Sequence, residues 1–175
     1  MAGISISPAV VAELARQLNH ENVAAYGYQA MALWCEDRNF GGFARFFLKQ
    51  ASEERGHARK FTDHLLDRGV LPELTALAAP RGQFASLMDV ARHALTMEQE
   101  NTTGIHAAYE VAVRDKDYPA QVLLHWFISE QVEEEDWARE MIDRLARAEC
   151  PGGLAELDRH IERYLGGGDN DDTPL

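Results

Sequence analysis

The sequence is poor in the features that define several protein classes. Only two of its 175 residues are cysteines, Cys35 and Cys150, and their separation matches no zinc or redox motif. A disulfide-stapled scaffold is therefore excluded, and a reducing cytoplasm is the expected compartment. Strand signals are nearly absent, because no alternating run rich in Val, Ile and Thr lies between turn residues. This scarcity argues against a fold built on a β-sheet.

Long apolar runs and a basic leader are missing as well. Residues 123–128 form a mostly apolar segment that contains a histidine, and the longest uninterrupted apolar run, residues 30–35, has six residues. It falls far short of the ~20 residues that an α-helix needs to span a bilayer. The N-terminus has no basic segment followed by an apolar stretch, so no signal peptide is visible. We expect neither membrane insertion nor secretion.

Basic residues are outnumbered by acidic ones. The chain has 17 Lys+Arg against 29 Asp+Glu, which gives a formal net charge of −12. Such a chain is not expected to bind nucleic acid phosphates or the anionic surface of a membrane. The same charge attracts cations, so a cationic ligand is the more natural partner.

Helix-compatible segments separated by short breaks make up most of the sequence. The length suggests one domain, which we place at residues 1–165, and the Gly- and Asp-rich residues 166–175 are expected to form a disordered tail. Proline, glycine and capping residues mark the breaks. The first predicted helix covers residues 8–38, and the second runs from the Asn39–Gly42 turn to residue 68. The third covers residues 86–116, and the fourth runs from the Asp117 cap to just before Pro151. A short fifth helix covers residues 154–165.

The lengths of the connections predict the topology. Short turns make the first two helices antiparallel, and likewise the third and fourth. The middle connection, which contains Pro72, Pro80 and Gly82, has about 15 residues and can stretch over ~50 Å at 3.3 Å per residue. A helix of ~28 residues is ~42 Å long, so this connection can return along the whole bundle. The expected fold class is all-α: a four-helix up-down bundle with one long crossover and a short fifth helix.

Each of the four long helices carries one glutamate on its expected core face. A bundle core is read at alternating steps of three and four residues, and the four glutamates lie near the helix midpoints, so they should meet at one level. The predicted core positions are Leu14, Gln17, Glu21, Ala24, Tyr28, Met31 and Cys35; Phe43, Phe47, Gln50, Glu54, His57, Phe61 and Leu65; Leu87, Ala91, Ala94, Glu98, Asn101, Ile105 and Ala108; and Leu124, Phe127, Gln131, Glu134, Ala138, Met141 and Leu145.

Converging buried carboxylates need a counter-charge. Burying a carboxylate costs several kcal/mol unless it is paired or coordinated, and no Lys or Arg occupies a predicted core position. Bound cations would supply the charge. Carboxylates with a single imidazole suit iron or manganese, with zinc as a competitor. Glu54 and His57, spaced i, i+3, share one helical face and can hold one metal.

Taken singly, these features have ordinary explanations. An isolated Glu-x-x-His is usually surface chemistry, and the runs at Glu53–Glu54 and Glu133–Glu135 would be solvated faces. Glu21 or Glu98 alone could be a residue on the helix surface, if the assignment of the core-facing positions of that helix were off by one step. Four independent glutamates at core positions and equal depth are much harder to explain in this way.

At these motifs the sequence resembles the bacterial non-haem ferritins. The resemblance covers about residues 8–148 and rests on Glu21, Glu54-x-x-His57, Glu98, Ser129-Glu130-Gln131-x-Glu133-Glu134, Trp34-Cys35 and Asp117-Tyr118-Pro119. It implies a ferritin-like di-iron domain that stores iron. Such a protein oxidises Fe(II) to Fe(III) with O2 or H2O2 and deposits it as a mineral inside a homo-oligomeric shell, usually of 24 subunits.

The resemblance also implies roles for individual residues. One iron site would use Glu21, Glu54 and His57, and a second would use Glu98 and Glu134, with Glu54 bridging and Gln131 nearby. Glu53, Glu130 and Glu133 match a third iron site beside the dinuclear centre. Tyr28 matches a tyrosine next to the centre that can donate an electron.

The sequence differs from the motifs of related proteins at two positions, and each difference changes what we expect of the metal site. A generic di-iron bundle carries Glu-x-x-His on two helices, but here the second motif is Gln131-x-x-Glu134, so the second metal should be held more loosely. Bacterioferritins bind haem through a methionine directly after the glutamate of the second helix. Arg55 occupies that position, so no haem is expected.

Four alternatives remain at this stage. A rubrerythrin-like di-iron peroxidase shares the bundle, but usually adds a Cys-x-x-Cys iron domain that is absent here. A bacterioferritin-type protein without haem fits the same ligands. A mini-ferritin that protects DNA would place its iron ligands between subunits. A purely structural bundle leaves the core glutamates unexplained.

Overall fold

The computed structural model describes residues 6–148 and 150–165, and within them every regular element is a helix. No described helix combines the length and apolarity needed to cross a membrane. The predicted tail at residues 166–175 lies outside the described residues. The helices are α1 (Pro8–Asp37), α2 (Gly41–Asp67), α3 (Leu87–Arg114), α4 (Tyr118–Arg147) and α5 (Pro151–Leu165).

Side-chain caps set three of the helix starts. The Ser7 hydroxyl accepts a hydrogen bond from the Val10 amide at 3.1 Å, and Pro8 occupies the first turn of α1. Ser86 caps α3 in the same way. The Asp117 carboxylate accepts from the Ala120 amide at 3.1 Å at the start of α4. The capping role predicted for Asp117 is confirmed.

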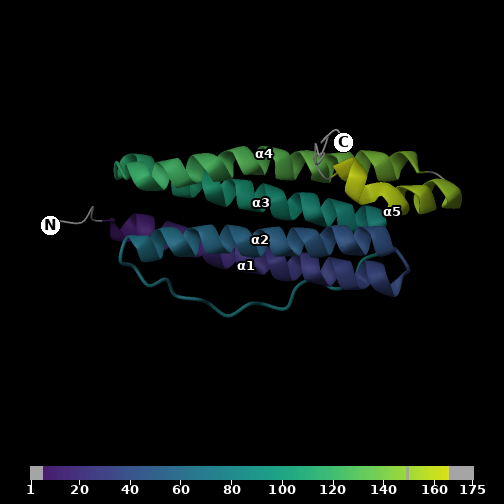
Figure 1. Cartoon of the computed structure of the whole chain (residues 1–175), viewed down its shortest axis with the longest axis horizontal. Coiled ribbons are helices and arrows are strands. Elements are labelled where there is room, and N and C mark those ends of the chain that lie inside the picture. Colours follow the sequence, from purple (N-terminus) through teal and green to yellow (C-terminus); the bar gives the residue numbers. More distant parts are fainter. Residues whose placement is uncertain (1–5, 149, 166–175) are drawn as a thin grey trace, which may run out of the picture.

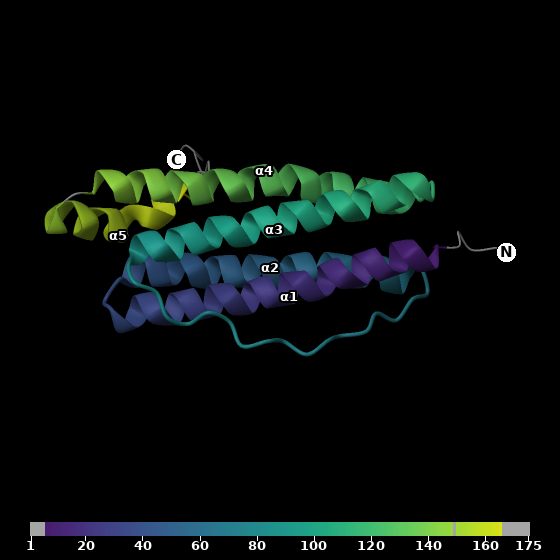
Figure 2. The same cartoon turned by 180° about the vertical axis from the view of Figure 1, so that it is seen from behind.

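The bundle has the predicted topology. Figures 1 and 2 show α1 beside α2 and α3 beside α4, with the segment between α2 and α3 running along the outside of the bundle from one end to the other. This crossover has no regular secondary structure over residues 70–84. It sets α3 parallel to α2, so the four-helix bundle with one long crossover and a short fifth helix is confirmed.

The core consists of two apolar clusters with a polar layer between them. One cluster gathers Tyr28, Phe43 and Phe47 with the buried face of α5, and the other gathers Leu14, Phe61 and other residues towards the N-terminus of α1. Every predicted core position is buried except Leu145, which is half-buried. The predicted glutamates occupy the level between the two clusters.

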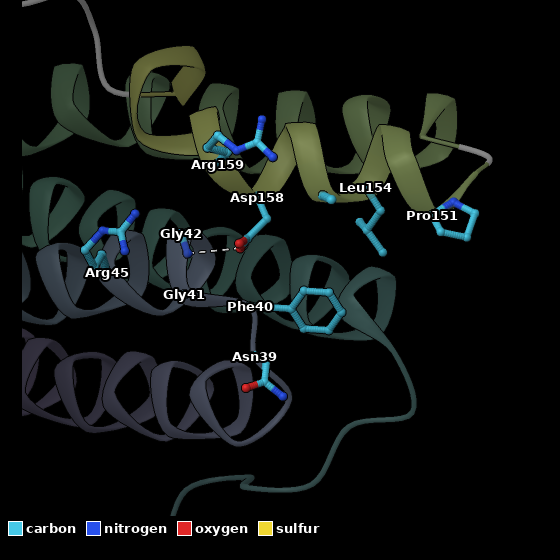
Figure 3. Close-up of a pocket in the computed structure, with 10 residues that line it drawn as sticks. Asn39, Phe40, Gly41, Gly42, Arg45, Pro151, Leu154, Asp158 and Arg159 are labelled. Carbon is cyan, nitrogen blue, oxygen red and sulfur yellow. Dashed lines mark hydrogen bonds between the residues drawn. The ribbon is translucent and has the colours of Figure 1, made fainter.

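Two helix starts differ from the prediction. The turn was expected to include Gly41 and Gly42, but α2 already begins at Gly41. The reason is a cap from a distant segment: Asp158 of α5 accepts hydrogen bonds from the Gly42 and Phe43 amides, both at 3.0 Å. Figure 3 shows the bond from Gly42. Likewise α5 begins at Pro151 rather than residue 154, because proline suits the first turn of a helix.

Candidate metal centre

The polar layer is built from side chains of all four long helices. Its buried members are Gln17, Glu21, Gln50, Glu54, His57, Glu98, Asn101, Gln131 and Glu134. No Lys or Arg is among the buried residues of the described chain. The layer therefore concentrates carboxylates at depth with His57 and no Lys or Arg among them.

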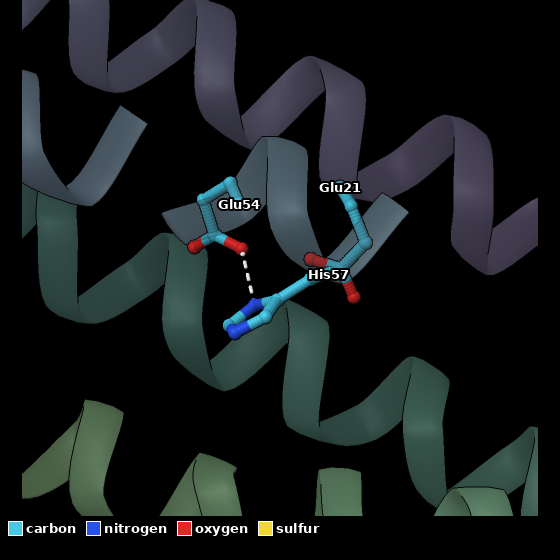
Figure 4. A group of neighbouring side chains, drawn as sticks. All are labelled: Glu21, Glu54 and His57. Atoms are coloured by element: carbon cyan, nitrogen blue, oxygen red, sulfur yellow. Dashed lines mark hydrogen bonds and ion pairs between the residues drawn. The ribbon is translucent and has the colours of Figure 1, made fainter. Parts of the chain in front are cut away.

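One cluster joins α1 to α2. Glu21, Glu54 and His57 each offer a ligand atom within 4.8 Å of the others (Figure 4). His57 Nδ1 lies 2.9 Å from Glu54 Oε2. One oxygen of each carboxylate, Glu21 Oε1 and Glu54 Oε1, is buried without a hydrogen-bond partner. Buried carboxylate oxygens that no donor reaches are costly, and a bound cation would satisfy both.

A second cluster shares the same imidazole. His57, Glu130 and Glu134 also offer ligand atoms within 4.8 Å of one another, and His57 Nε2 lies 3.8 Å from Glu130 Oε1. The histidine thus lies between two groups of carboxylates, one on each ring nitrogen. Glu98 belongs to neither group, but its charge and that of Glu54 act on Glu134 across the layer.

Glu98 is held by two donors. The Tyr28 hydroxyl donates to Glu98 Oε1, and the Gln131 amide donates to Oε2 at 3.2 Å. Burial, followed by the negative charge of Glu54, raises the pKa of Glu98 to about 8, although both donors act in the opposite direction. Burial also raises the pKa of Tyr28 well above its usual value. The tyrosine therefore keeps its proton and stays a donor.

Glu134 and Glu21 are shifted in the same direction. Burial, followed by the charge of Glu98, raises the pKa of Glu134 well above its usual range, even though Trp137 Nε1 donates to its Oε2. Burial and the charge of Glu54 raise the pKa of Glu21. Without a cation, burial and mutual repulsion favour the protonated forms of these carboxyls. A metal ion that binds them must displace those protons.

The residues expected at a third site lie on the α2–α4 side of the layer. Glu53, Glu130 and Glu133 line a cavity of about 410 Å³ together with Glu134 and Trp137. Burial raises the pKa of Glu130. Only Glu130 of the three belongs to a group of side chains that could hold a metal ion; Glu133 is exposed and Glu53 lies 3.9 Å from Lys49. The structure brings the three to one cavity without closing them into a tight site.

Four residues to which sequence analysis assigned no role hold the layer together. Gln17 and Asn101 hydrogen-bond to each other at 3.0 Å, Gln50 donates to Glu134 at 3.2 Å, and Trp137 donates to the same carboxylate. Three of them were predicted at core positions. A polar amide at such a position is itself a signal, because a buried amide needs partners.

Comparison with known proteins agrees with this architecture. Residues 11–148 match the model of the ferritin family, described as the ferritin-like domain. The chain is 42% identical over 131 residues to the bacterial non-heme ferritins of Staphylococcus haemolyticus and Staphylococcus aureus (strain USA300), which covers 75% of this chain and 79% of theirs.

Solved structures give the same result. The chain superposes with a TM-score of 0.88 and 33% identity on an open-pore ferritin from the hyperthermophilic archaeon Archaeoglobus fulgidus, over 90% of this chain and 98% of that one. A humanized archaeal ferritin also gives a TM-score of 0.88, at 32% identity, over 90% of this chain and 96% of its own. The resemblance first noted in the glutamate motifs therefore extends over the whole bundle, and this chain belongs to the ferritin family.

Proposed function

We propose that this protein is an iron-storage ferritin that oxidises Fe(II) at a dinuclear centre within each subunit. Glu21, Glu54 and His57 would hold one iron, and Glu98 and Glu134 the other, with Glu54 between them and Gln131 alongside. The product Fe(III) would pass to a mineral inside a shell formed by copies of the chain. The relatives described as bacterial non-heme ferritins support this assignment.

One observation carries the proposal: the buried layer is rich in carboxylates and has no Lys or Arg within it. Two carboxylate oxygens, on Glu21 and Glu54, have no hydrogen-bond partner. A structural role would require donors for these atoms. Two divalent cations supply both the missing charge and the missing partners, and carboxylates with one imidazole suit iron.

The chemistry needs little from the protein beyond geometry and charge. Each of the two Fe(II) ions loses one electron. O2 takes up the two electrons and two protons to give H2O2, or H2O2 takes up two electrons and two protons to give two waters. Protons released from the carboxyl groups of Glu21, Glu98 and Glu134 on metal binding are available for this reduction. In this proposal Tyr28, whose hydroxyl hydrogen-bonds to Glu98, serves as a reserve donor of one of these electrons.

The second iron should be the more mobile one. Only one histidine lies in the layer, next to Glu54 and within reach of Glu130. The remaining proposed ligands are carboxylates. Further acidic groups beside them can take over Fe(III) as new ligands, so the iron leaves the centre more readily. The cavity lined by Glu53, Glu130 and Glu133 adjoins Glu134 and offers such groups. We propose it as a third site through which iron leaves the centre.

Assembly into a shell of 24 cytoplasmic subunits completes the proposal. Large apolar side chains stand exposed on the crossover, where Leu71 is 86% and Leu74 is 71% accessible. Such side chains suit contacts between copies of the chain. Arg55 occupies the position of the haem-binding methionine of bacterioferritins, so the proposed centre works without haem.

The decisive experiment removes the shared histidine. In His57→Ala, the fast phase of Fe(II) oxidation should disappear in stopped-flow measurements at about two Fe(II) per subunit, while helix content and particle mass stay unchanged. Glu54→Ala should behave in the same way. His64→Ala is the matched control, because His64 lies on the same helix but contacts Arg68 instead of the layer. An unchanged fast-phase amplitude in His57→Ala would rule out the proposed centre.

A separate variant tests the third site. Glu130→Ala should leave the first round of oxidation intact, because Glu130 is not among the proposed dinuclear ligands. It should change the O2 consumed per iron and slow later rounds. A crystal soaked in Fe(II) should show density between Glu53, Glu130 and Glu133. Its absence at full occupancy of the dinuclear centre would count against the third site.

A further inference from the structure

A chain of hydrogen bonds connects the surface of α1 to the polar layer. It begins at Arg16, whose side chain is 44% exposed. Arg16 Nη1 donates to Gln17 Oε1 at 2.6 Å, and Nη2 donates to the Gly104 carbonyl of α3 at 3.0 Å and to Glu13 at 2.6 Å. The guanidinium thus bridges α1 and α3 at the edge of the bundle.

The chain continues inward through two fully buried amides. Gln17 Nε2 donates to Asn101 Oδ1 at 3.0 Å. Asn101 Nδ2 donates to Glu21 Oε2 and to Gln131 Oε1, both at 3.2 Å. Gln131 Nε2 in turn donates to the Glu98 carboxylate and to the Glu98 carbonyl. We call Arg16, Gln17, Asn101 and Gln131 the amide chain.

The direction of every bond in the amide chain follows from its outer end. A guanidinium has donors and no acceptor, so Gln17 must turn its oxygen towards Arg16 and its NH2 towards Asn101. Asn101 must then turn its oxygen towards Gln17 and its NH2 inward. One hydrogen of that NH2 serves Glu21 and the other serves Gln131. Gln131 has to present its own NH2 to Glu98.

This fixed direction serves both halves of the metal centre. Glu21 belongs to the first proposed iron site and Glu98 to the second, and each carboxylate receives an N–H from the amide chain. Asn101 is the branch point, because its two hydrogens lead to the two sites. The side-chain oxygen of Gln131 accepts a hydrogen bond from Asn101, so Gln131 interacts with Glu98 through its NH2 group, as a donor.

A glycine makes room for the amide chain. A Cβ atom at position 104 would lie 2.4 Å from Gln17 Oε1 and 3.0 Å from Arg16 Nη1. Any other residue there would force the Gln17 amide to shift from the position in which it bonds to Asn101. Gly104 lies in the interior of α3, where glycine is unfavourable for the helix. The close approach of Gln17 accounts for its presence.

We propose that Asn101 is a positioning residue that couples the two metal sites, with its direction set by Arg16 through Gln17. The inference rests on the proposed dinuclear function. Hydrogen bonds to metal-ligating carboxylates orient them, and losing such a partner typically weakens metal binding or activity by roughly 10–100-fold. The second site has no histidine of its own, so it should depend most on this support.

The Gly104→Ala variant distinguishes a positioning role of the amide chain from a purely structural one. Alanine favours the helix, so a purely structural role predicts unchanged or higher thermal stability with normal metal binding. Positioning predicts unchanged helix content and a second Co(II) equivalent bound roughly tenfold more weakly or worse, with an altered visible absorption spectrum. The matched control is Gly56→Ala, since a Cβ atom there meets nothing within 4 Å.

Asn101→Leu tests the branch point directly. It keeps the approximate volume and removes both inward hydrogens, and Gln121→Leu is its control, because Gln121 makes one interhelical bond to the Ala112 carbonyl far from the layer. Co(II) alone is the probe, added to metal-free protein. Loss of the second equivalent in Asn101→Leu and Gly104→Ala, with both controls normal, supports the proposal.

Two other results of the Co(II) titrations would contradict the proposed role of Asn101, and they can be told apart. If the wild-type protein binds two Co(II) ions and both variants bind them with wild-type affinity and spectrum, Asn101 does not couple the sites, while the dinuclear centre stands. If the wild-type protein itself binds no pair of Co(II) ions, both this inference and the proposed function fail.

Discussion

Tyr28 donates its hydroxyl hydrogen to Glu98 across the middle of the bundle, from α1 to α3, and both side chains are buried. Burial and the surrounding carboxylates raise the pKa of Tyr28, so the donor role persists over the accessible pH range. Together with Gln131 on the other oxygen, the tyrosine fixes the carboxylate that we assign to the second iron.

Tyr28→Phe should therefore shift the pH dependence of iron oxidation. A donor stabilises the charged form of Glu98, so its removal raises the pKa of Glu98 further above about 8. Iron needs the ionised carboxylate, and the rising limb of the pH–rate profile should move to higher pH. The buried acceptor left without its donor should lower the free energy of unfolding by about 1–3 kcal/mol.

Stopped-flow oxidation across pH, beside thermal unfolding, checks this prediction. Tyr109→Phe is the control, because its hydroxyl lies 2.8 Å from His125 Nε2 on the surface, away from the layer. Superimposable pH profiles for Tyr28→Phe and the wild-type protein would contradict the assigned role.

Docking of α5 should depend on one of two neighbouring glycines. A Cβ atom on Gly42 would lie 1.6 Å from the backbone oxygen of Asp158, which a helix cannot move cheaply. Gly42→Ala should displace α5 and expose it to proteolysis. Gly41→Ala should not, because its nearest contact is Arg45 at 3.6 Å. Asp158→Ala, which removes only the cap on α2, should cost about 1 kcal/mol.

Limited proteolysis and thermal unfolding distinguish these variants. The expected order of resistance to cleavage within α5 is wild type, Asp158→Ala, then Gly42→Ala. Equal cleavage of Gly41→Ala and Gly42→Ala would show that the close approach between α2 and α5 does not hold the fifth helix in place.

An ion pair between the largely buried side chain of Arg68 and the buried Asp117 links the end of α2 to the start of α4. Arg68 Nη1 lies 2.7 and 2.8 Å from the two oxygens of Asp117, which also caps α4. Arg68→Met should lower the free energy of unfolding by about 3–5 kcal/mol, because it leaves a buried charge without its partner. Arg59→Met, which breaks an exposed pair with Asp63, should change it little.

Chemical denaturation of the metal-free protein measures both changes. The double variant Arg68→Met with Asp117→Asn should recover part of the loss, because the uncompensated charge is gone while the amide oxygen still caps α4. If Arg68→Met and Arg59→Met lose the same small amount, the pair at the α2–α4 junction does not contribute as a buried ion pair.

The sequence was sufficient for the bundle and for the depth of its glutamates. Periodicity places Glu21 and Glu98 in the core, because a step of three or four residues fixes which face is buried. Periodicity says nothing about partners, so it could not foresee that Asn101 joins Gln17 to Glu21. The early start of α2 was missed for a related reason: its cap, Asp158, lies far away in the sequence.

Replacing Glu98 with Gln should stabilise the metal-free protein above pH ~5 and impair its iron chemistry. The pKa of Glu98 is about 8 in the folded protein and near 4.5 when unperturbed. Between these values the folded state binds more protons than the unfolded state, so this group makes stability fall as pH rises from about 4.5 to about 8. Glutamine cannot ionise and removes that fall. It also fits, because its oxygen can accept from Gln131 and its NH2 can donate to the Tyr28 hydroxyl oxygen.

The stability advantage of Glu98→Gln over the wild-type protein should thus be small near pH 5 and grow towards pH 8, in denaturation curves recorded after chelation of metals. Oxidation of paired Fe(II) should slow, because the amide offers the second metal no charge. Glu110→Gln, an exposed change on the same helix, should alter neither property. A structural Glu98 predicts the reverse pattern, a loss of about 1–3 kcal/mol with normal oxidation. That pattern would move Glu98 out of the metal centre and leave the second iron with Glu134 as its remaining proposed ligand beside the bridging Glu54.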